Sequence, residues 1–222
     1  MKAVSLMSGG IDSPVASYLM SRAGADVILL HMDNSPYSDD RARANVVAIA
    51  EQLDRYTGKH FPLYFAPHGP SQTAIREACD RNYQCVMCKR AMHRTAAEFA
   101  GIVGADAIVM GDSLGQGASQ TLKNLRAEHQ SLSVPIVRPL IGLDKTEIME
   151  IARRIGTFDI STSPSTGCTI VPSKVTTAAD PARIASFSLD LDALAREAAE
   201  KAALVRRDGT AALRDQLMLR LT

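Results

Sequence analysis

The chain has 222 residues, of which 46% are hydrophobic and 22% charged, and its formal net charge is +1. These values are ordinary for a globular protein, and they exclude a disordered chain and a strong overall basic field for nucleic acid. No apolar run approaches the roughly 20 residues that a membrane helix needs, and Met1-Lys2 leads directly into an apolar segment without room for a signal peptide. We therefore expect a cytoplasmic protein with no membrane partner.

The N-terminal stretch from Lys2 to Ala16, KAVSLMSGGIDSPVA, predicts a strand, a glycine loop and a helix. Asp12 and Ser13 are good helix N-caps, and Pro14 suits the first helical position. Such a loop directs unpaired backbone N–H groups toward one point at the positive end of a helix dipole, which favours a phosphate. An ordinary turn, in which glycine serves tightness alone, is the alternative.

The glycine loop itself, Ser8-Gly9-Gly10-Ile11-Asp12-Ser13, is not followed by Gly-Lys-Ser/Thr, so it is not a Walker A loop. It resembles the PP-loop of ATP pyrophosphatases, which split ATP into AMP and pyrophosphate while adenylating a substrate. This resemblance implies that Gly9 and Gly10 let the backbone approach the nucleotide and that Asp12 and Ser13 are needed for turnover.

Strand and helix patterns alternate along most of the chain. Periodicity predicts further strands at 26–32, 61–65, 107–110 and 134–137, and helices at 14–23, 39–56, 73–79, 89–102, 118–125, 145–155, 181–207 and 210–221. This alternation predicts an α/β fold with a doubly wound, mostly parallel sheet of about five strands. We expect an ATP pyrophosphatase domain over 1–175 and a helical extension over 176–222, packed on the core or at a dimer interface.

Polar residues follow the ends of several predicted strands, where open α/β sheets bind ligands. His31 and Met32 end one strand and are candidates to border a nucleotide, although a half-buried histidine with a local hydrogen bond is an equally simple interpretation of His31. Asp112 follows another strand and is a candidate to hold Mg²⁺, with a helix cap as the alternative.

Four cysteines, at positions 79, 85, 88 and 168, do not resemble a disulfide framework. Cys85-x-x-Cys88 with Cys168 allows a redox dithiol, a zinc site with His93 as the nearby fourth ligand, or an iron–sulfur cluster on three thiolates. The neighbouring basic residues are expected to lower the thiol pKa values and to attract an RNA phosphate, unless they only form a solvated helix face: Lys89, Arg90 and Arg94.

From Met1 to about Lys174 the chain resembles the PP-loop domain of the 4-thiouridine tRNA sulfurtransferases, the ThiI family. Besides the glycine loop, the resemblance rests on five segments: Cys88-Lys89-Arg90, Gly111 to Gln116, Ser119-Gln120-Thr121 with Asn124 to Arg126, Arg138 to Gly142, and Asp144-Lys145. It implies ATP contacts at Met7, Ser8, His31, Met32, Arg90, Gly111 and Gln120, and a sulfur-handling role for Cys168.

The resemblance further implies a reaction in which a uridine carbonyl, expected in tRNA, is adenylated with ATP and Mg²⁺ and then thiolated. The Cys85–Cys88 pair is similar to that of archaeal-type members, in which Cys85, Cys88 and Cys168 hold a [4Fe–4S] or [3Fe–4S] cluster. Members of the family also carry a ferredoxin-like region, a tRNA-binding THUMP domain and, in many bacteria, a rhodanese domain, which this sequence does not contain. We therefore expect weak tRNA binding by the chain alone, a separate tRNA-binding partner or sulfur donor, and a homodimer.

Two other functions remain open at this point. One is an amide- or nitrile-forming ATP pyrophosphatase for a small molecule, with structural zinc at Cys85 and Cys88. The other is a nucleotide-binding or sulfur-carrying subunit of a larger thiolation complex.

Overall fold

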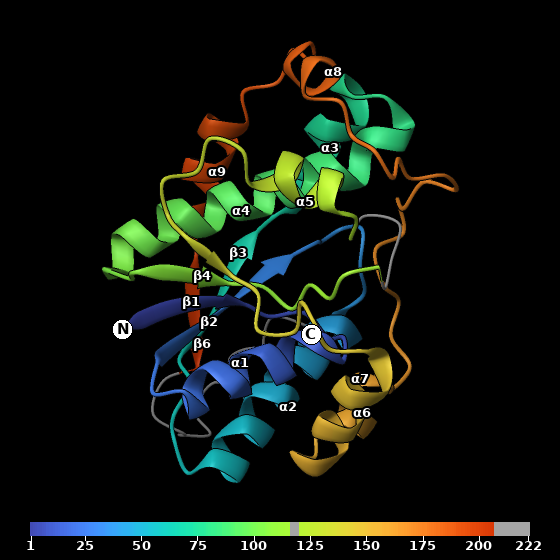
Figure 1. The fold of residues 1–222 in the computed structure, drawn as a ribbon. Helices are drawn as coiled ribbons and strands as arrows, with labels where there is room; N and C mark the ends of the chain where they lie inside the picture. The colour runs from blue at the N-terminus through green and yellow to red at the C-terminus, as the bar shows by residue number, and fades with distance from the viewer. Residues whose placement is uncertain (116–119, 207–222) are drawn as a thin grey trace.

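A computed structural model describes residues 1–115 and 120–206 (Figure 1). Within these residues, a six-stranded sheet has the order β5-β4-β1-β2-β3-β6. Five strands run parallel to their neighbours: β1 (Lys2–Leu6), β2 (Asp26–Asp33), β3 (Leu63–Pro67), β4 (Ala107–Val109) and β5 (Ile136–Val137). The sixth, β6 (Ala203–Arg206), pairs antiparallel with β3. The predicted α/β fold with a mostly parallel sheet is confirmed.

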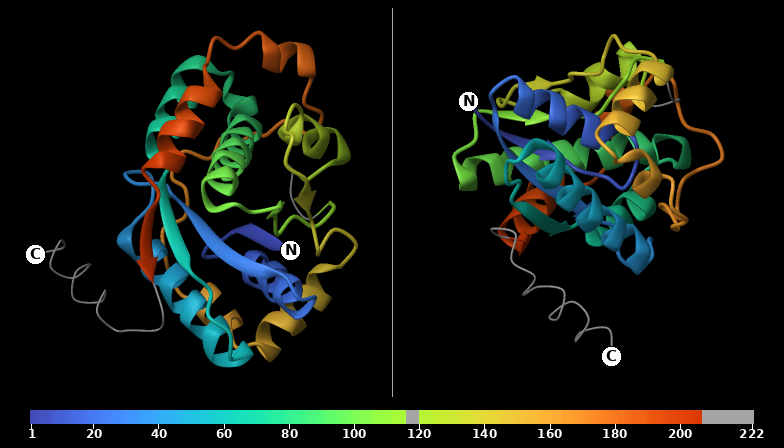
Figure 2. Two further views of the ribbon diagram at one scale, coloured as in Figure 1. Left: turned by 90° about the vertical axis from the view of Figure 1, so that its left-hand side faces the viewer. Right: turned by 90° about the horizontal axis from the view of Figure 1, so that it is seen from below.

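Helices cover both faces of the sheet (Figures 1 and 2). One face carries α1 (Asp12–Arg22), α2 (Asp40–Thr57), α6 (Lys145–Arg154) and α7 (Phe158–Ser161). On the other face lie α4 (Gln84–Val103) and α9 (Leu191–Glu200), with α3 (Gly69–Ala78), a 3₁₀ turn (Arg81–Tyr83), α5 (Leu122–His129) and α8 (Pro181–Ala185) beside them. No helix in this described part of the chain combines the length and the apolar character that crossing a membrane requires.

The central strands are apolar on both sides because both faces are covered. In β1, Ala3 packs with residues of α1 and α2, whereas Val4 packs with Phe99 of α4. Side chains alternate between the faces of a strand, so a strand buried on both faces shows a nearly continuous apolar run in the sequence. This explains why the strand positions could be predicted from such runs.

The strand order places a topological switch point beside β1. The chain passes from β1 to β2 on one side and reaches β4, on the other side of β1, only after α4. The loops that follow β1 and β4 therefore diverge at the carboxyl edge of the sheet, where open α/β folds bind ligands.

Some element predictions are wrong. The predicted helix over 181–207 is α8, α9 and the edge strand β6, and α5 begins at Leu122 behind the cap Thr121. An alanine-rich helical pattern continues into residues 203–206, but pairing with the free edge of β3 outweighs it. Residues 118 and 119 of the predicted 118–125 helix lie outside the described residues, as does the whole of the predicted 210–221 helix.

Candidate active site

The glycine loop between β1 and α1 is organised by two serine hydroxyls. Ser13 Oγ accepts a hydrogen bond from the backbone N–H of Ser8 at 2.9 Å, and Ser8 Oγ accepts one from Gly10 N–H at 3.2 Å. The expectation that Asp12 or Ser13 caps α1 is wrong, because both lie inside the first turn and the cap position, Ile11, makes no side-chain hydrogen bond. Ser13 bonds back to the loop instead. The start of α1 thus lacks a side-chain cap, as an anion-binding helix terminus requires.

Gly111, which follows β4, lies directly against this loop. A Cβ atom at this position would lie 2.9 Å from the backbone nitrogen of Ser13 and 3.0 Å from the carbonyl carbon of Asp12. Only glycine therefore allows the two strand ends to meet, and the structure brings together two segments that lie about 100 residues apart in the sequence.

Asp12 forms an ion pair with Lys145, the first residue of α6. The helix is fixed at this end by a capping box, in which Asp144 Oδ1 accepts from Glu147 N–H at 2.9 Å and the Glu147 carboxylate accepts from Asp144 N–H at 2.8 Å. The predicted capping box is confirmed. Lys145 belongs to a segment that carries the family resemblance, but the sequence analysis did not select it as a site residue. Its position at a capped helix start, shortly after Arg138–Gly142, could have indicated a role in the site.

His31 joins the glycine loop to the neighbouring strand. Its Nδ1–H donates to the carbonyl of Met7 at 2.8 Å, and its ring lies 4.8 Å from that of Phe65. Burial lowers the pKa of His31 below its ordinary value, so the ring is neutral at neutral pH. Met32, the next residue, is buried with Leu30 in the core on the α4 side. Met7, Ser8, Ser13, Gly111 and His31 thus gather at one edge of the sheet.

The cysteine cluster, defined as Cys85, Cys88 and Cys168, lies at the N-terminal end of α4. The side-chain amide of Gln72 in α3 reaches two of its sulfurs, with Nε2 at 3.5 Å from Cys168 Sγ and 3.9 Å from Cys88 Sγ. Each of the three residues is partly buried, whereas Cys79 is buried in an apolar cluster with Ile75, against which Cys88 also packs. Cys168 and Cys88 are thus within reach of one side chain although they are distant in the sequence, and a site formed by all three cysteines stays a prediction.

The loop that carries Cys168 is anchored from both sides of that residue. Thr169 N–H donates to the carbonyl of Tyr37 at 2.9 Å, and Thr166 N–H donates to Asp39 Oδ2 at 3.0 Å. Tyr37 in turn holds α3 through a 2.8 Å hydrogen bond between its hydroxyl and that of Thr73. These contacts fix Cys168 relative to α3 and hence to Cys88.

The thiol pKa values are raised, contrary to the expectation from the neighbouring basic residues. Burial, and then the charge of Cys168, raises the pKa of Cys85, and burial raises the pKa of Cys88 to about 12. Lys89 acts in the opposite direction on both but is outweighed. Three thiolates in one site repel one another and need a positive charge among them, and three thiolates are the donor set of an iron–sulfur cluster.

A histidine that the sequence analysis did not select lies at this cluster. His68, between β3 and α3, is fully buried, and its Nε2 is 3.1 Å from Cys88 Sγ. Burial, and then the charge of the nearby His31, lowers the pKa of His68 to about 4. The only signal for it in the sequence was its position at the end of a parallel strand. His93, the expected fourth zinc ligand, instead donates from Nδ1 to the Glu128 carbonyl at 3.2 Å.

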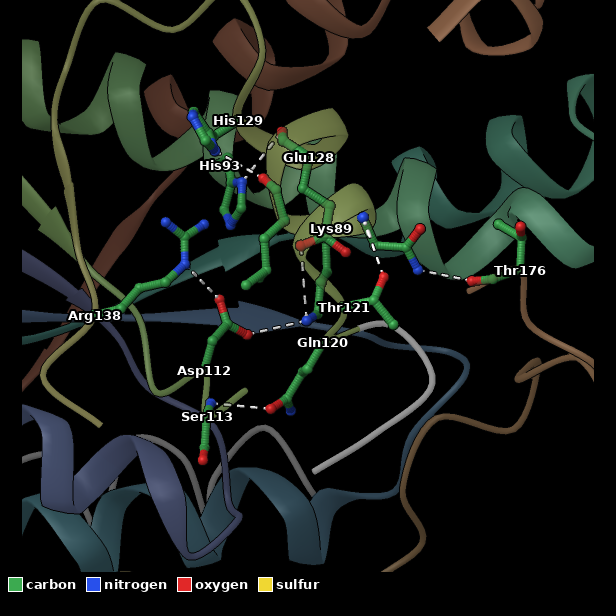
Figure 3. A network of polar contacts seen from close by, with 12 residues as sticks. Lys89, His93, Asp112, Ser113, Gln120, Thr121, Glu128, His129, Arg138 and Thr176 are labelled. Atoms are coloured by element: carbon green, nitrogen blue, oxygen red, sulfur yellow. Dashed lines mark hydrogen bonds and ion pairs between the residues drawn. The ribbon is translucent and has the colours of Figure 1, made fainter. Parts of the chain in front are cut away.

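Asp112 lies at the centre of a buried charge network (Figure 3). Its Oδ1 accepts from Lys89 Nζ at 3.0 Å and its Oδ2 from Arg138 Nε at 3.1 Å. Lys89 Nζ also lies 3.8 Å from Glu128 Oε2. Burial alone would raise the pKa of Asp112, but Lys89 and then Arg138 hold it below its ordinary value. Asp112 is thus an anchor for two cations, and the α5 cap is Thr121, not Asp112.

His93, Asp112 and Glu128 place their potential ligand atoms within 4.8 Å of one another, which is close enough for a metal ion. Burial raises the pKa of Glu128 to about 7 and lowers that of His93 to about 4. However, Lys89 and Arg138 already face these carboxylates, and a divalent cation would be repelled by both. The arrangement is better described as a charge-balanced network that fixes Lys89 and Arg138.

The remaining candidates lie on either side of this network. Gln120 Oε1 accepts from Ser113 N–H at 2.9 Å, which holds the segment after Gly111 (Figure 3). Arg90 is buried, and its Nη1 donates to the carbonyl of Ala127 in α5. Burial lowers the pKa of Arg90 to about 10. Arg94 donates to Asp192 of α9 at 2.7 Å. The contacts of both arginines are therefore with α5 and α9, not with the glycine loop.

A family model described as thiamine biosynthesis protein (ThiI) matches residues 1–192. The probable tRNA sulfurtransferase of Methanosarcina acetivorans is 49% identical over 172 residues, covering 77% of this chain and 42% of that protein. The one from Methanothermobacter thermautotrophicus is 45% identical over 188 residues, covering 84% of this chain and 48% of that protein. The chain thus spans less than half the length of these curated relatives.

Among solved structures, a 4-thiouridine synthetase in complex with RNA and bound ATP superposes with a TM-score of 0.86 at 34% identity, over 91% of this chain and 54% of that chain. The NMN synthetase of Francisella tularensis superposes with a TM-score of 0.57 at 16% identity, over 88% and 81% of the two chains, and shares the fold. By its family model and by these relatives, the chain belongs to the ThiI family.

Proposed function

We propose that this chain carries the catalytic centre of an ATP-dependent tRNA sulfurtransferase, which adenylates a uridine carbonyl with release of pyrophosphate and then replaces the oxygen by sulfur. One observation supports this most directly: the glycine loop and the cysteine cluster are neighbours. The carbonyl of Met7 in the loop accepts from His31 of β2, His68 N–H donates to the carbonyl of Asp33 at the end of that strand at 2.8 Å, and His68 Nε2 lies 3.1 Å from Cys88 Sγ. A single substrate can therefore meet both the nucleotide and the sulfur.

ATP would lie at the switch point, with its phosphates on the N–H groups of Gly9 and of Ile11 to Ser13, since those of Ser8 and Gly10 donate to serine hydroxyls, and with Gly111 close beneath. A solved structure similar to this chain, that of a 4-thiouridine synthetase in complex with RNA, holds bound ATP. For Mg²⁺, both oxygens of Asp112 already face cations, whereas Asp12, in the first turn of α1, pairs with Lys145 through Oδ1 and is partly exposed. We therefore assign Asp12, with the phosphate oxygens, to Mg²⁺, and Lys145 to the departing pyrophosphate.

A uridine carbonyl oxygen is a poor leaving group, and adenylation converts it into AMP. In the first step the carbonyl oxygen attacks the α-phosphorus, and the bond to pyrophosphate breaks. In the second step a sulfur nucleophile from the cysteine cluster forms a C–S bond, and the C–O bond breaks with AMP as the leaving group. The loop N–H groups and Lys145 stabilise charge that develops on the phosphates, which is the interaction that accelerates such a reaction.

The cysteine cluster fits an iron–sulfur cluster held by Cys85, Cys88 and Cys168. When bound, such a cluster supplies one iron without a protein ligand, where sulfide can be held. Two of the side chains come from α4 and the third from an anchored loop, with Gln72 in reach of both Cys88 and Cys168, and a positively charged centre would relieve the repulsion among the thiolates. The cysteine cluster has a second way to deliver sulfur, which is a persulfide on Cys168.

tRNA is the proposed substrate, since a solved structure similar to this chain is a 4-thiouridine synthetase–RNA complex. Binding by this chain alone is expected to be weak, because its net charge is +1 and Arg90 and Arg94 are engaged by α5 and α9. The logarithm of the binding constant should fall linearly with the logarithm of the salt concentration, at a slope of about −0.7 to −0.9 per phosphate contact. A homodimer, or a separate protein that recognises tRNA, would strengthen it.

The experiment is to incubate anaerobically reconstituted protein with ATP, Mg²⁺, sulfide and unmodified tRNA, and to analyse nucleotides and tRNA together. We expect AMP and pyrophosphate, with 4-thiouridine detected by its near-ultraviolet absorption. ADP as the main product would refute the adenylation step. AMP formation on a small molecule, without thiolation of any tRNA in the presence of cell extract, would refute the substrate.

A further inference from the structure

The cysteine cluster has two nitrogen donors on one face of α3. His68 and Gln72 are four residues apart, so they lie one above the other at the start of the helix. His68 Nε2 is 3.1 Å from Cys88 Sγ, and Gln72 Nε2 is 3.5 Å from Cys168 Sγ and 3.9 Å from Cys88 Sγ. The two side chains thus contact the sulfurs of Cys88 and Cys168, which come from different parts of the chain.

Both side chains are almost fully buried, with exposed fractions of 0% for His68 and 3% for Gln72. Within the described residues, His68 Nδ1 and Gln72 Oε1 have no hydrogen-bond partner. Leaving buried polar atoms unpaired is unfavourable. The pairing that each side chain does make is therefore with sulfur, and a sulfur acceptor requires that the proton of His68 be on Nε2.

We propose that His68 and Gln72 are positioning residues of the sulfur centre, donating N–H hydrogen bonds to Cys88 and Cys168 while these bind the iron–sulfur cluster. This inference rests on the cluster in the proposed function. Hydrogen bonds to cysteine sulfurs stabilise the more negatively charged, reduced state of a cluster and so raise its reduction potential. They also fix the direction of each sulfur before the metal binds.

Direct ligation by His68 is the competing role. Two ligands on one tetrahedral metal ion lie about 3.5 Å apart, given bonds of about 2.0 Å to nitrogen and 2.3 Å to sulfur. The observed 3.1 Å between His68 Nε2 and Cys88 Sγ is shorter than that separation and lies within hydrogen-bonding distance of a sulfur atom.

The test compares the reconstituted full chain with His68→Leu, Gln72→Leu and the conservative His68→Gln, which returns an amide donor near the Nε2 position. Thr73→Val is the matched control, since Thr73 is on the same helix and bonds to Tyr37 instead of to a sulfur. Iron and sulfide content, the reduction potential and pulsed EPR of the reduced cluster are measured for each folded variant.

We expect a more negative potential, or loss of iron and sulfide from a folded protein, in His68→Leu and Gln72→Leu. His68→Gln should restore the wild-type behaviour at least in part, and Thr73→Val should retain it. Unchanged potentials and full loading in both leucine variants would overturn the inference. So would strong nitrogen coupling in the wild type that disappears in His68→Leu, because it would make His68 a ligand.

Two further outcomes keep the test decisive. If the buried His68→Leu fails to fold, Gln72→Leu carries the decision, because its side chain is replaced near the start of the helix by one of similar size. If wild-type protein itself takes up no iron and sulfide, the cluster in the proposed function is refuted, and this inference with it. If the wild type takes up the cluster and both leucine variants have the same loading and reduction potential as the wild type, this inference alone is refuted.

Discussion

The carboxylate of Asp12 forms an ion pair with the ammonium group of Lys145, although 133 residues separate them in the chain. The pair joins the start of α1 to the start of α6, so that a fixed positive charge lies beside the loop on which we place the phosphates of ATP. Both side chains remain partly exposed, at 25% for Asp12 and 40% for Lys145. A pair so exposed contributes only about 0–1 kcal/mol to stability, which favours a role in binding or catalysis.

Replacing either partner should therefore impair turnover more than folding. For Asp12→Asn and Lys145→Met we expect AMP formation from ATP to fall by about 10²-fold or more, since a group that stabilises developing charge is lost. The melting temperature should change little. Lys201→Met removes an exposed lysine that pairs with Glu197 in α9 and serves as the control. Wild-type rates of AMP formation in both Asp12→Asn and Lys145→Met would contradict the assignment.

Gly111→Ala tests the contact between the strand ends. The new Cβ atom would lie within 3.0 Å of backbone atoms of Asp12 and Ser13, so the loop must shift. We expect a loss of roughly 1–3 kcal/mol in the free energy of unfolding, together with weaker ATP binding measured by calorimetry. The matched control is Gly101→Ala in α4, where a Cβ would meet nothing within 4 Å. That change should stabilise the helix by about 0.5–1 kcal/mol. Equal ATP affinity in the two variants would show that the loop tolerates displacement.

The sequence was informative where local pattern and topology act together. The apolar runs predicted the parallel strands, and the rule that their carboxyl ends share one edge predicted that the segments after β1, β2 and β4 would meet. The approach of Cys168 to Cys88, both of which are within reach of Gln72, is what the chemistry of a three-thiolate site predicts. In each case a short-range signal was combined with a constraint that holds for the whole fold class.

The sequence was misleading where tertiary contacts decide. Arg90 and Arg94 follow the cysteines in a basic segment, but α5 and α9 dock on them and engage them with a carbonyl and with Asp192. The thiol pKa values depend on burial, which outweighs a neighbouring lysine that the sequence shows. His68 carries no local signal beyond its place after β3. Only the packing of α3 against α4 brings it to Cys88.

The four cysteines should separate into two classes when replaced. Cys85→Ala, Cys88→Ala and Cys168→Ala should each lose most of the iron and sulfide of the reconstituted protein, because three thiolates are needed to hold a cluster. Cys79→Ala should retain both, since Cys79 lies in an apolar cluster with Ile75 and Val86. Metal and sulfide analysis with visible absorption measures this. Zinc without sulfide in the wild type, lost with the same three cysteines, would contradict the cluster and identify a zinc site.

The buried network around Asp112 should make folding stability depend on pH through Glu128. Burial raises the pKa of this carboxyl from the ordinary 4.5 to about 7, with Asp112 acting in the same direction and Lys89, Arg138 and Arg90 opposing it. Between these two values the folded protein keeps a proton that the unfolded chain releases. Stability contributed by the protonated Glu128 is therefore complete below about pH 4.5 and is lost as the pH rises through 7.

Glu128→Gln keeps the shape of the side chain but cannot ionise, so it should remove this loss. Between pH 5 and pH 8 we expect the free energy of unfolding of the variant to improve relative to wild type by about 2–3 kcal/mol, from the size of the pKa shift. Urea unfolding at the two pH values measures the difference. Buried His93 has a lowered pKa and destabilises the fold in acid, but it does so in both proteins and cancels in the comparison. Glu77→Gln, at an exposed position of α3, is the control. A variant whose stability relative to wild type is the same at both pH values would show that Glu128 is ionised throughout, and that Lys89 neutralises it in the folded protein.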